Sequence, residues 1–312
     1  MPGWNQLDAP DQSGRIHVVT GANSGIGFEV AKMLAAKRAT VVLACRSERK
    51  AEAAAALIRA SVPDALLEVM PLDVSDLSSI RAFAAKVIEA HPCIDVLINN
   101  AGVMALPYQK TVDGFEMQFG TNHLGQFALT ALLLPTLEHA AAPRVVSVSS
   151  TAHRAGTPRL DDLQSEKSYQ KWRAYGASKL SNLLFTYELE RRLRAANKKT
   201  IAVACHPGYA STNLLMVGPA LEKNKLASAI MKLGNALVAQ SAEHGAWPTL
   251  FAATEPSVVG GQFIGPSGMF ELSGPPHVVG SNAKSKDEHL ARELWAASEK
   301  LTNTAYDLPR SA

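Results

Sequence analysis

The chain has 312 residues, of which 47% are hydrophobic and 19% are charged, and its net charge is +3. This length and composition allow a full-sized hydrophobic core and exclude a disordered protein. The small net charge provides no polycationic surface, so neither nucleic acid nor an anionic membrane is an expected partner.

The N-terminal residues 1–13 predict a short polar leader, because they lack the apolar core of a signal peptide. No later run approaches about 18 uninterrupted apolar residues, so no transmembrane segment is predicted. The three cysteines are odd in number and far apart, which excludes a disulfide framework and a zinc-ligand pattern. We therefore expect a soluble protein in a reducing, cytoplasmic compartment, with no metal site.

From residue 14 onward, short apolar runs alternate with longer stretches of helical periodicity. The runs are apolar on both faces, which is typical of strands buried between two layers of helices. Strands are predicted at Ile16–Thr20, Thr40–Cys45, Leu67–Leu72, Val96–Asn99, Arg144–Ser149 and Ile201–Cys205. Helices are predicted at Ser24–Ala36, Ser47–Ala60, Ser75–His91, Ala174–Ala196 and Ser285–Thr302. The pattern predicts one α/β domain over residues 14–312, a doubly wound parallel sheet of Rossmann type with helices on both faces.

A glycine-rich turn follows the first predicted strand and leads directly into a helix. Its expected contact residues for a ligand are Gly21, Asn23, Ser24, Gly25, Ile26 and Gly27. Backbone N–H groups in such a turn can approach a pyrophosphate, and the helix N-terminus adds about half a positive charge. The spacing Gly-x3-Gly-x-Gly differs from the commoner G-x-G-x-x-G fingerprint, although the mechanics are the same. The turn predicts a dinucleotide site, and a tight turn without a ligand is the alternative.

The residue after the second predicted strand indicates which dinucleotide is bound. An NAD site usually carries an acidic residue there, to hold the ribose 2′-hydroxyl. This sequence has Arg46 instead, followed by Arg49 and Lys50 a turn later. A guanidinium forms paired, charge-assisted hydrogen bonds with phosphate, so NADP(H) is favoured over NAD(H). At least one of Arg49 and Lys50 is expected on a solvated helix face.

A candidate catalytic pair lies in the helical stretch after the fifth predicted strand. Tyr175 and Lys179 are four residues apart, so they share one helix face. A phenol has an ordinary pKa near 10, but a nearby cation and a positively charged nicotinamide both favour its phenolate. Tyr175 is therefore a candidate general acid–base. The pair alone is a weak signal, because this spacing occurs by chance in many helices.

Taken together, the motifs resemble the short-chain dehydrogenase/reductase family over roughly residues 14–265. Besides the glycine turn, the resemblance rests on Leu72-Asp73-Val74, Asn99-Asn100-Ala101-Gly102, Asn122, Ser150, Tyr175 with Lys179, and His206-Pro207-Gly208. The most similar branch is that of the retinol dehydrogenases and protochlorophyllide reductases, on Ala44-Cys45-Arg46, Thr121-Asn122-His123-Leu124-Gly125 and Asp162-Leu163-Gln164-Ser165-Glu166. Members of that branch typically prefer NADP(H).

The resemblance implies a role for each matching residue. Ser150 would hold the substrate oxygen and Tyr175 would exchange the proton. Lys179 would bind the nicotinamide ribose and lower the pKa of Tyr175, and Asn122 would hold a water that continues the proton relay. The remaining cofactor contacts would be Asp73 and Val74 at the adenine, Asn99, Ala101 and Gly102 beside the fourth strand, and Pro207, Gly208 and Thr212 at the nicotinamide end. Alternatively, Asn99 and Asn122 satisfy backbone groups.

Two features depart from the retinol dehydrogenase branch. Retinol-active relatives often carry an N-terminal membrane anchor, whereas this chain is expected to have only the polar leader. The variable substrate loop, at about 209–240, has no counterpart that identifies a substrate, and its residues Leu214–Val217 indicate either an apolar ligand or a buried loop end. Leu226, Ile230, Leu233 and Leu237 within 213–240 follow a helical stripe that packs on the domain, lines the pocket, meets a partner or touches a membrane.

The sequence predicts an NADP(H)-dependent oxidoreductase that moves hydride between nicotinamide and an apolar carbonyl or alcohol substrate. The alternative is a non-catalytic, NADP(H)-sensing regulatory protein. A hydrolase triad through His123 or His153 is disfavoured, because no G-x-S-x-G elbow precedes Ser150. A small-molecule substrate is the expected partner, together with a homodimer or homotetramer of the kind that is common among the relatives.

Overall fold

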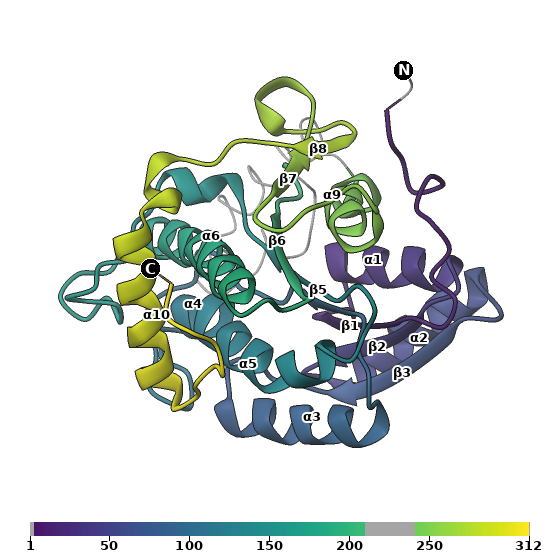
Figure 1. The fold of residues 1–312 in the computed structure, drawn as a ribbon, viewed down its shortest axis with the longest axis horizontal. Helices are drawn as coiled ribbons and strands as arrows, with labels where there is room; N and C mark the ends of the chain where they lie inside the picture. Colours follow the sequence, from purple (N-terminus) through teal and green to yellow (C-terminus); the bar gives the residue numbers. More distant parts are fainter. Residues whose placement is uncertain (1–2, 210–240, 312) are drawn as a thin grey trace.

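In the computed structural model, which describes residues 3–209 and 241–311, eight strands form one sheet in the order β3-β2-β1-β4-β5-β6-β7-β8 (Figure 1). The strands are β1 Ile16–Thr20, β2 Thr40–Cys45, β3 Leu66–Pro71, β4 Val96–Asn99, β5 Arg144–Val148, β6 Ile201–Cys205, β7 Phe263–Pro266 and β8 Pro276–Val278. All neighbours are parallel except β8, which runs antiparallel to β7. The predicted doubly wound α/β fold is confirmed, with bounds that differ by one residue at β3 and β5.

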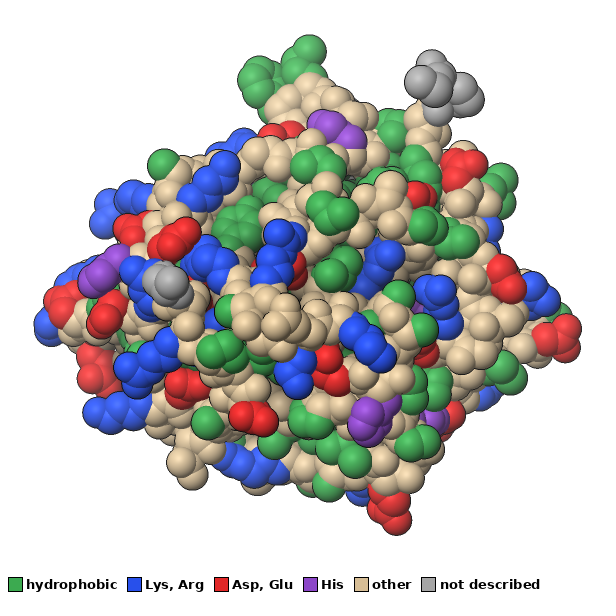
Figure 2. All heavy atoms as spheres, in the orientation of Figure 1, with side chains coloured by type: hydrophobic (Ala, Val, Ile, Leu, Met, Phe, Trp, Pro, Cys, Tyr) green, Lys and Arg blue, Asp and Glu red, His purple; other side chains and the backbone are tan. Residues whose placement is uncertain are grey.

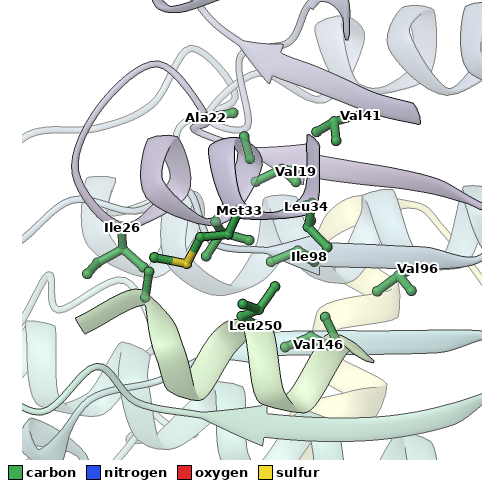
Figure 3. Close-up of a cluster of buried hydrophobic side chains, with 14 of the residues drawn as sticks. Val19, Ala22, Ile26, Met33, Leu34, Val41, Val96, Ile98, Val146 and Leu250 are labelled. Atoms are coloured by element: carbon green, nitrogen blue, oxygen red, sulfur yellow. The ribbon is translucent and has the colours of Figure 1, made fainter. Parts of the chain in front are cut away.

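Helices cover both faces of the sheet (Figure 1). On one face lie α1 Gly25–Ala36, α2 Glu48–Ser61 and α9 Ala242–Thr254, and on the other lie α3 Leu77–Ala90, α5 Gly125–Leu137, α6 Lys171–Ala195 and α10 Glu288–Thr302. Figure 3 shows the hydrophobic core on the α1, α2 and α9 side of the sheet, where Met33 and Leu34 of α1 and Leu250 of α9 pack against the strands. The central strands are buried on both faces, as their uninterrupted apolar runs predict.

The continuous helical segment that runs from α4 Met117–Phe119 to α5 was not predicted from the sequence. Its two α-helices are joined by a π-helical segment at Gly120–Leu124, labelled η1. Nearly every residue of α5 is buried, so the continuous helical segment carries no polar stripe that a search for amphipathic periodicity would find. Short π-helical segments inside α-helices occur frequently at functional sites, and Asn122 lies within this one.

Residues 3–13 pack against the domain. The Trp4 ring meets the Phe251 ring of α9 edge-on, with the centroids 5.1 Å apart. Lys37, at the end of α1, donates through Nζ to the Leu7 carbonyl at 2.7 Å, and Arg38 pairs with Asp11 at 2.7 Å. The contacts tie this segment to the outer side of α1 and α9.

The helix α10 covers the outer faces of α5 and α6. Its Trp295 is 2% exposed and meets the rings of Phe127 and Phe185, at centroid distances of 5.1 and 5.8 Å. The Arg192 guanidinium lies over the Trp295 ring at 4.3 Å, an arrangement that a cation and an aromatic face favour. Within the part of the chain that the structure describes, no helix is long and apolar enough to cross a bilayer.

Replacing Trp295 by Ala is expected to lower the free energy of unfolding by about 3–5 kcal/mol, because a large buried ring leaves a cavity that the surroundings only partly fill. Urea denaturation followed by circular dichroism measures this loss. The matched control is Glu293→Ala, an exposed position on the same helix, which should stay within about 0.5 kcal/mol of the wild type. A loss below about 1 kcal/mol for Trp295→Ala would contradict the tight packing of α10.

Candidate active site

A cleft of about 520 Å³ opens at the carboxyl ends of the strands, where the strand order reverses between β1 and β4. It is lined by most residues that the sequence assigns to cofactor or catalysis: Gly21, Asn23, Ser24, Gly25, Ile26, Gly27, Arg46, Asp73, Val74, Ala101, Gly102, Ser150, Tyr175, Lys179, Pro207 and Gly208. Asn99 and Asn122 are not part of the lining. Thr212 and the predicted substrate-loop stripe from Leu226 to Leu237 lie outside the described residues.

The glycine turn forms one end of the cleft. Gly21 has a φ of +69°, which favours glycine. A Cβ on Gly27 would lie 2.4 Å from Asn100 Nδ2 and 2.6 Å from the Gly21 carbonyl oxygen, so only glycine fits there. The side chain of Ser24, the N-cap residue of α1, makes no capping hydrogen bond. The positive end of the α1 dipole is therefore available to an anion bound in the cleft.

Asn99 and Asn100 point to opposite sides, since consecutive residues of an extended chain alternate. Asn99 is buried and donates through Nδ2 to Thr130 Oγ1 on α5, at 2.9 Å. Asn100 lines the cleft, and its Nδ2 donates to the Thr20 carbonyl at 2.8 Å. The asparagine that supports the glycine turn is therefore Asn100, whereas Asn99 lies behind the wall and does not line the cofactor cleft as expected.

Arg46 lies where β2 opens into the cleft. Its side chain is 77% exposed, and its Nη1 lies 3.8 Å from Asp73 Oδ2. The Asp73 carboxylate is itself held by Ser75, whose Oγ and backbone N–H both donate to Oδ1. An exposed pair at this distance contributes little to stability, so Arg46 can turn to a bound phosphate at small cost. Arg49 and Lys50 do not line the cleft.

At the other end of the cleft, α6 is fastened to the end of β5. Lys179 donates through Nζ to the Val148 carbonyl at 2.9 Å, and Ser149 Oγ donates to the Lys179 carbonyl at 2.8 Å. The Lys179 Nζ lies 5.9 Å from the centroid of the Tyr175 ring. These contacts bring the side chains of Ser150, Tyr175 and Lys179 to one wall of the cleft.

Burial dominates the protonation of this wall. It raises the pKa of Tyr175 to about 12, although a hydrogen bond with Ser150 acts in the opposite direction. Burial also lowers the pKa of Lys179 to about 8, from an ordinary value of 10.5. In the protein alone, therefore, the phenol is not made acidic by Lys179, and the expected lowering of its pKa depends on charge that a cofactor would add.

Asn122 braces the wall from the π-helical segment. Its Oδ1 accepts from the Val103 N–H at 2.7 Å, and its Nδ2 donates to the Val103 carbonyl and to Ser178 Oγ, both at 2.9 Å. The side chain is fully buried and joins η1, the loop after β4, and α6. A Cβ on Gly102 would lie 2.9 Å from Asn122 Oδ1, so the loop passes very close to this brace. Two of these contacts satisfy the backbone of Val103 and the third reaches the Ser178 hydroxyl, so the Asn122 side chain connects the two segments.

The cleft lining also includes apolar residues that the sequence did not indicate: Val103, Met104, Met117, Ala152 and Trp172. The ring of Trp172 meets the ring of Tyr175 edge-on at 6.5 Å and is partly exposed. Trp172 lies one helical turn before Tyr175, so helical spacing from the candidate catalytic residue is the signal that would have found it.

The family model for short chain dehydrogenases matches residues 15–220, and the chain belongs to this family. It is accordingly a hydride-transfer oxidoreductase with a nicotinamide cofactor, and the predicted resemblance to the retinol dehydrogenase branch is confirmed. Mouse retinol dehydrogenase 14 is 41% identical over 300 residues, which cover 92% of this chain and 86% of that protein. Mouse retinol dehydrogenase 12 is 51% identical over 195 residues, or 62% and 61% of the two chains.

Solved structures agree with this fold. A protein of unassigned function from Mycobacterium paratuberculosis is 46% identical, with a TM-score of 0.81 and coverage of 98% of this chain and 100% of that one. A gluconate 5-dehydrogenase structure from Beutenbergia cavernae, which contains NADP, is 24% identical with a TM-score of 0.63 and covers 81% and 95%. At that identity the second likeness shows the fold alone.

Replacing Lys179 by Met is expected to stabilise the protein without cofactor at pH 7 by about 1–2 kcal/mol. Because burial lowers the pKa of Lys179, keeping its side chain charged in the folded state costs about 3 kcal/mol at pH 7. The variant avoids this cost but loses the hydrogen bond to the Val148 carbonyl, which offsets part of the stabilisation. Because the unfolded state binds more protons between pH 8 and 10.5, wild-type stability rises there and the advantage of the variant disappears.

Denaturant titrations of both proteins from pH 7 to 10.5 measure this effect. The matched control is Lys86→Met, an exposed lysine on α3, which should show no such dependence on pH. A Lys179→Met protein whose stability relative to wild type does not change with pH would rule out a buried, destabilising cation.

Proposed function

We propose that this protein is an NADP(H)-dependent oxidoreductase that interconverts an apolar carbonyl compound and the corresponding alcohol. The observation that carries the proposal is the single cleft that joins the glycine turn and Arg46 to the wall of Ser150, Tyr175 and Lys179. An anion-binding end and an acid–base end are thereby brought to opposite parts of one cavity.

The cleft residues fit an NADP(H) molecule. The N-terminus of α1 would hold the pyrophosphate, and the close approach at Gly27 leaves the backbone open to it. Arg46 would bind the 2′-phosphate, since a guanidinium is suited to a phosphate by shape and charge. Asp73 and Val74 would lie at the adenine, and Pro207 and Gly208 at the nicotinamide end. When bound, the nicotinamide supplies or accepts the hydride.

The catalytic wall would supply the proton. In carbonyl reduction, Ser150 donates a hydrogen bond to the substrate oxygen and Tyr175 donates its proton to that oxygen. Burial keeps the phenol protonated at neutral pH, so Tyr175 is ready to act as an acid. In alcohol oxidation the phenol must first lose its proton, and Lys179 on the same helix face would favour that loss. Asn122 would position this wall through Val103 and Ser178.

The substrate class follows from the wall beside Tyr175. Met104, Met117 and Trp172 line the same cleft as Ser150 and Tyr175, and both Met104 and Trp172 contact Tyr175. Pockets of this kind bind apolar molecules and orient them through a few polar contacts. We therefore assign an apolar substrate with one reactive oxygen.

Replacing Tyr175 by Phe should lower turnover by about 10³-fold, because it removes the acid–base group while retaining the ring. NADPH affinity should change less than about threefold, since the hydroxyl serves the chemistry rather than cofactor binding. NADPH oxidation across a panel of carbonyl compounds, together with calorimetric NADPH titration, measures both quantities.

The matched control for Tyr175→Phe is Tyr187→Phe, further along α6, where the hydroxyl contacts Ser281 at 2.9 Å and no cleft residue. This control should retain wild-type turnover. Undiminished turnover in Tyr175→Phe would refute the assignment of the proton donor. A wild-type protein that binds NADPH and reduces no compound in the panel would instead favour a nucleotide-sensing regulator.

Replacing Arg46 by Asp should weaken NADPH binding about 100-fold and NADH binding less than about threefold. The reason is the loss of charge-assisted hydrogen bonds that only the 2′-phosphate receives. Calorimetry with each nucleotide measures the ratio. Arg49→Asp makes the same charge change on the exposed face of α2, outside the cleft, and should leave this ratio near the wild-type value. Equal affinities of the wild type for NADPH and NADH would disprove the phosphate assignment.

A further inference from the structure

Behind the nicotinamide end of the cleft lies a cluster of titratable side chains, two of them fully buried histidines, that the proposed chemistry does not use. His206 follows β6 and is fully buried, and it immediately precedes the cleft residues Pro207 and Gly208. Glu271 reaches it from the loop between β7 and β8, which lies beside β6 at the end of the sheet (Figure 1). The loop is therefore in contact with the segment that forms the cleft wall.

The hydrogen bonds of His206 define its tautomer. Its Nδ1 accepts from the Gly208 N–H at 3.2 Å, so that nitrogen carries no proton. In the neutral ring the proton then sits on Nε2, which lies 3.1 Å from Glu271 Oε2. Burial lowers the pKa of His206 to about 4, which keeps the ring neutral at physiological pH and preserves the acceptor for Gly208.

Gly208 needs this support because its backbone is unusual. It has a φ of +67°, and a Cβ there would lie 2.4 Å from the Leu272 carbonyl oxygen. The next residue, Tyr209, donates its N–H to the same carbonyl at 2.9 Å. The cleft segment and the β7–β8 loop are thus in direct backbone contact, and no residue with a side chain fits at position 208.

Glu271 is fixed on its other side by Arg154. The Nη2 of Arg154 donates to Glu271 Oε1 at 2.9 Å, while the other carboxylate oxygen faces His206. Arg154 ends the short helix η2, Thr151–Arg154, whose N-cap is Ser150. The His153 ring in the same helix hydrogen-bonds through Nδ1 to the Ser150 carbonyl at 2.7 Å. One carboxylate therefore links the Gly208 segment to the helix that carries Ser150.

The loop itself is held in a costly conformation. Phe270 and Glu271 have φ values of 53° and 58°, a region that costs non-glycine residues roughly 1 kcal/mol or more each. Backbone strain of this kind persists only where surrounding contacts hold the residue in place. In this loop, Glu271 is held by Arg154 on one side and lies against His206 on the other. Apolar side chains gather at the tip of the hairpin, at the top of Figure 2, where Met269 is 79% exposed.

We propose that Glu271 is a positioning residue for the nicotinamide half of the cofactor: by bridging His206 and Arg154 it sets the Gly208 segment and the Ser150 helix at the distance that this half requires. The inference rests on the proposed function, because it takes the Pro207–Gly208 end of the cleft as the nicotinamide end. The adenine end of the cleft is formed by Arg46 and Asp73, which follow β2 and β3. The strands β1, β4, β5 and β6 separate this end from the β7–β8 loop, so Glu271 does not contact it.

The test compares two ligands that share the adenine end. NADPH carries the nicotinamide, whereas adenosine 2′,5′-bisphosphate lacks it. Glu271→Ala should weaken NADPH binding about tenfold and leave binding of the bisphosphate within about twofold of the wild type. Glu271→Gln keeps an oxygen beside His206 Nε2 and a side chain of the same length, and should restore most of the NADPH affinity. Met269→Ala, an exposed change on the same loop, is the matched control and should bind both ligands normally.

Arg154→Gln provides a second variant, which removes the guanidinium that contacts Glu271 Oε1 and leaves Glu271 and His206 themselves unchanged. Its side chain is 46% exposed, so the protein should fold, and NADPH binding should weaken in the same direction by about threefold. Wild-type NADPH affinity in both Glu271→Ala and Arg154→Gln would overturn the proposal. Equal losses for NADPH and the bisphosphate would also overturn it, since they indicate general destabilisation.

The outcome separates this inference from the proposed function. A wild-type protein that binds neither NADPH nor the bisphosphate would refute the NADP(H) assignment and the positioning role with it. A wild-type protein that binds both, with variants that bind both equally well, would refute only the positioning role.

Discussion

The attachment of α6 to the end of β5 is the contact on which the site depends. The Val148 carbonyl, the last of the strand, accepts from Lys179 and, at 3.3 Å, from Asn182 Nδ2, while Ser149 holds the helix backbone in return. Because the strand end carries Ser150 and the helix carries Tyr175 and Lys179, this contact fixes their relative positions. Asn122 adds a third support from η1 through Ser178. The groups proposed to react are thus placed by the same bonds that complete the fold.

Burial of these groups opposes stability. A cation and a phenol that are both removed from water have pKa values displaced toward their neutral forms, Lys179 downward and Tyr175 upward. A protein selected for stability alone would have an apolar residue in place of Lys179. The cation is tolerated because the surrounding sheet and helices are well packed, with Leu180 and Leu183 fully buried on α6 and Val146 fully buried on β5. Burying the Lys179 cation for its proposed role therefore lowers the free energy of unfolding, and the packing of the core offsets this cost.

The sequence predicted those parts of the fold whose physical signal is local. Strands buried on both faces have uninterrupted apolar runs, and the glycine turn must follow β1 and precede α1, so both were found. Helix α5 was missed because most of its residues are buried and it has no periodic polar face. Strand β8 has 3 residues and is too short to show a pattern, whereas β7 has 4, like the predicted β4, but two of them are Gly265 and Pro266, which are depleted in strands. The sequence assigned Asn99 rather than Asn100 to the cleft. Neighbouring residues of an extended chain face opposite sides, and the sequence does not show which of the two sides is the cleft.

The position of α10 has a consequence for biosynthesis. The ribosome adds Trp295 more than a hundred residues after Phe185 and well over a hundred after Phe127, yet these three rings share one cluster. Until α10 has left the ribosome and folded, the faces of α5 and α6 that it covers lack the Trp295 ring, and the cluster around Phe127 and Phe185 is incomplete. A chain without α10 therefore exposes apolar surface that the complete fold buries, and exposed apolar surface favours aggregation.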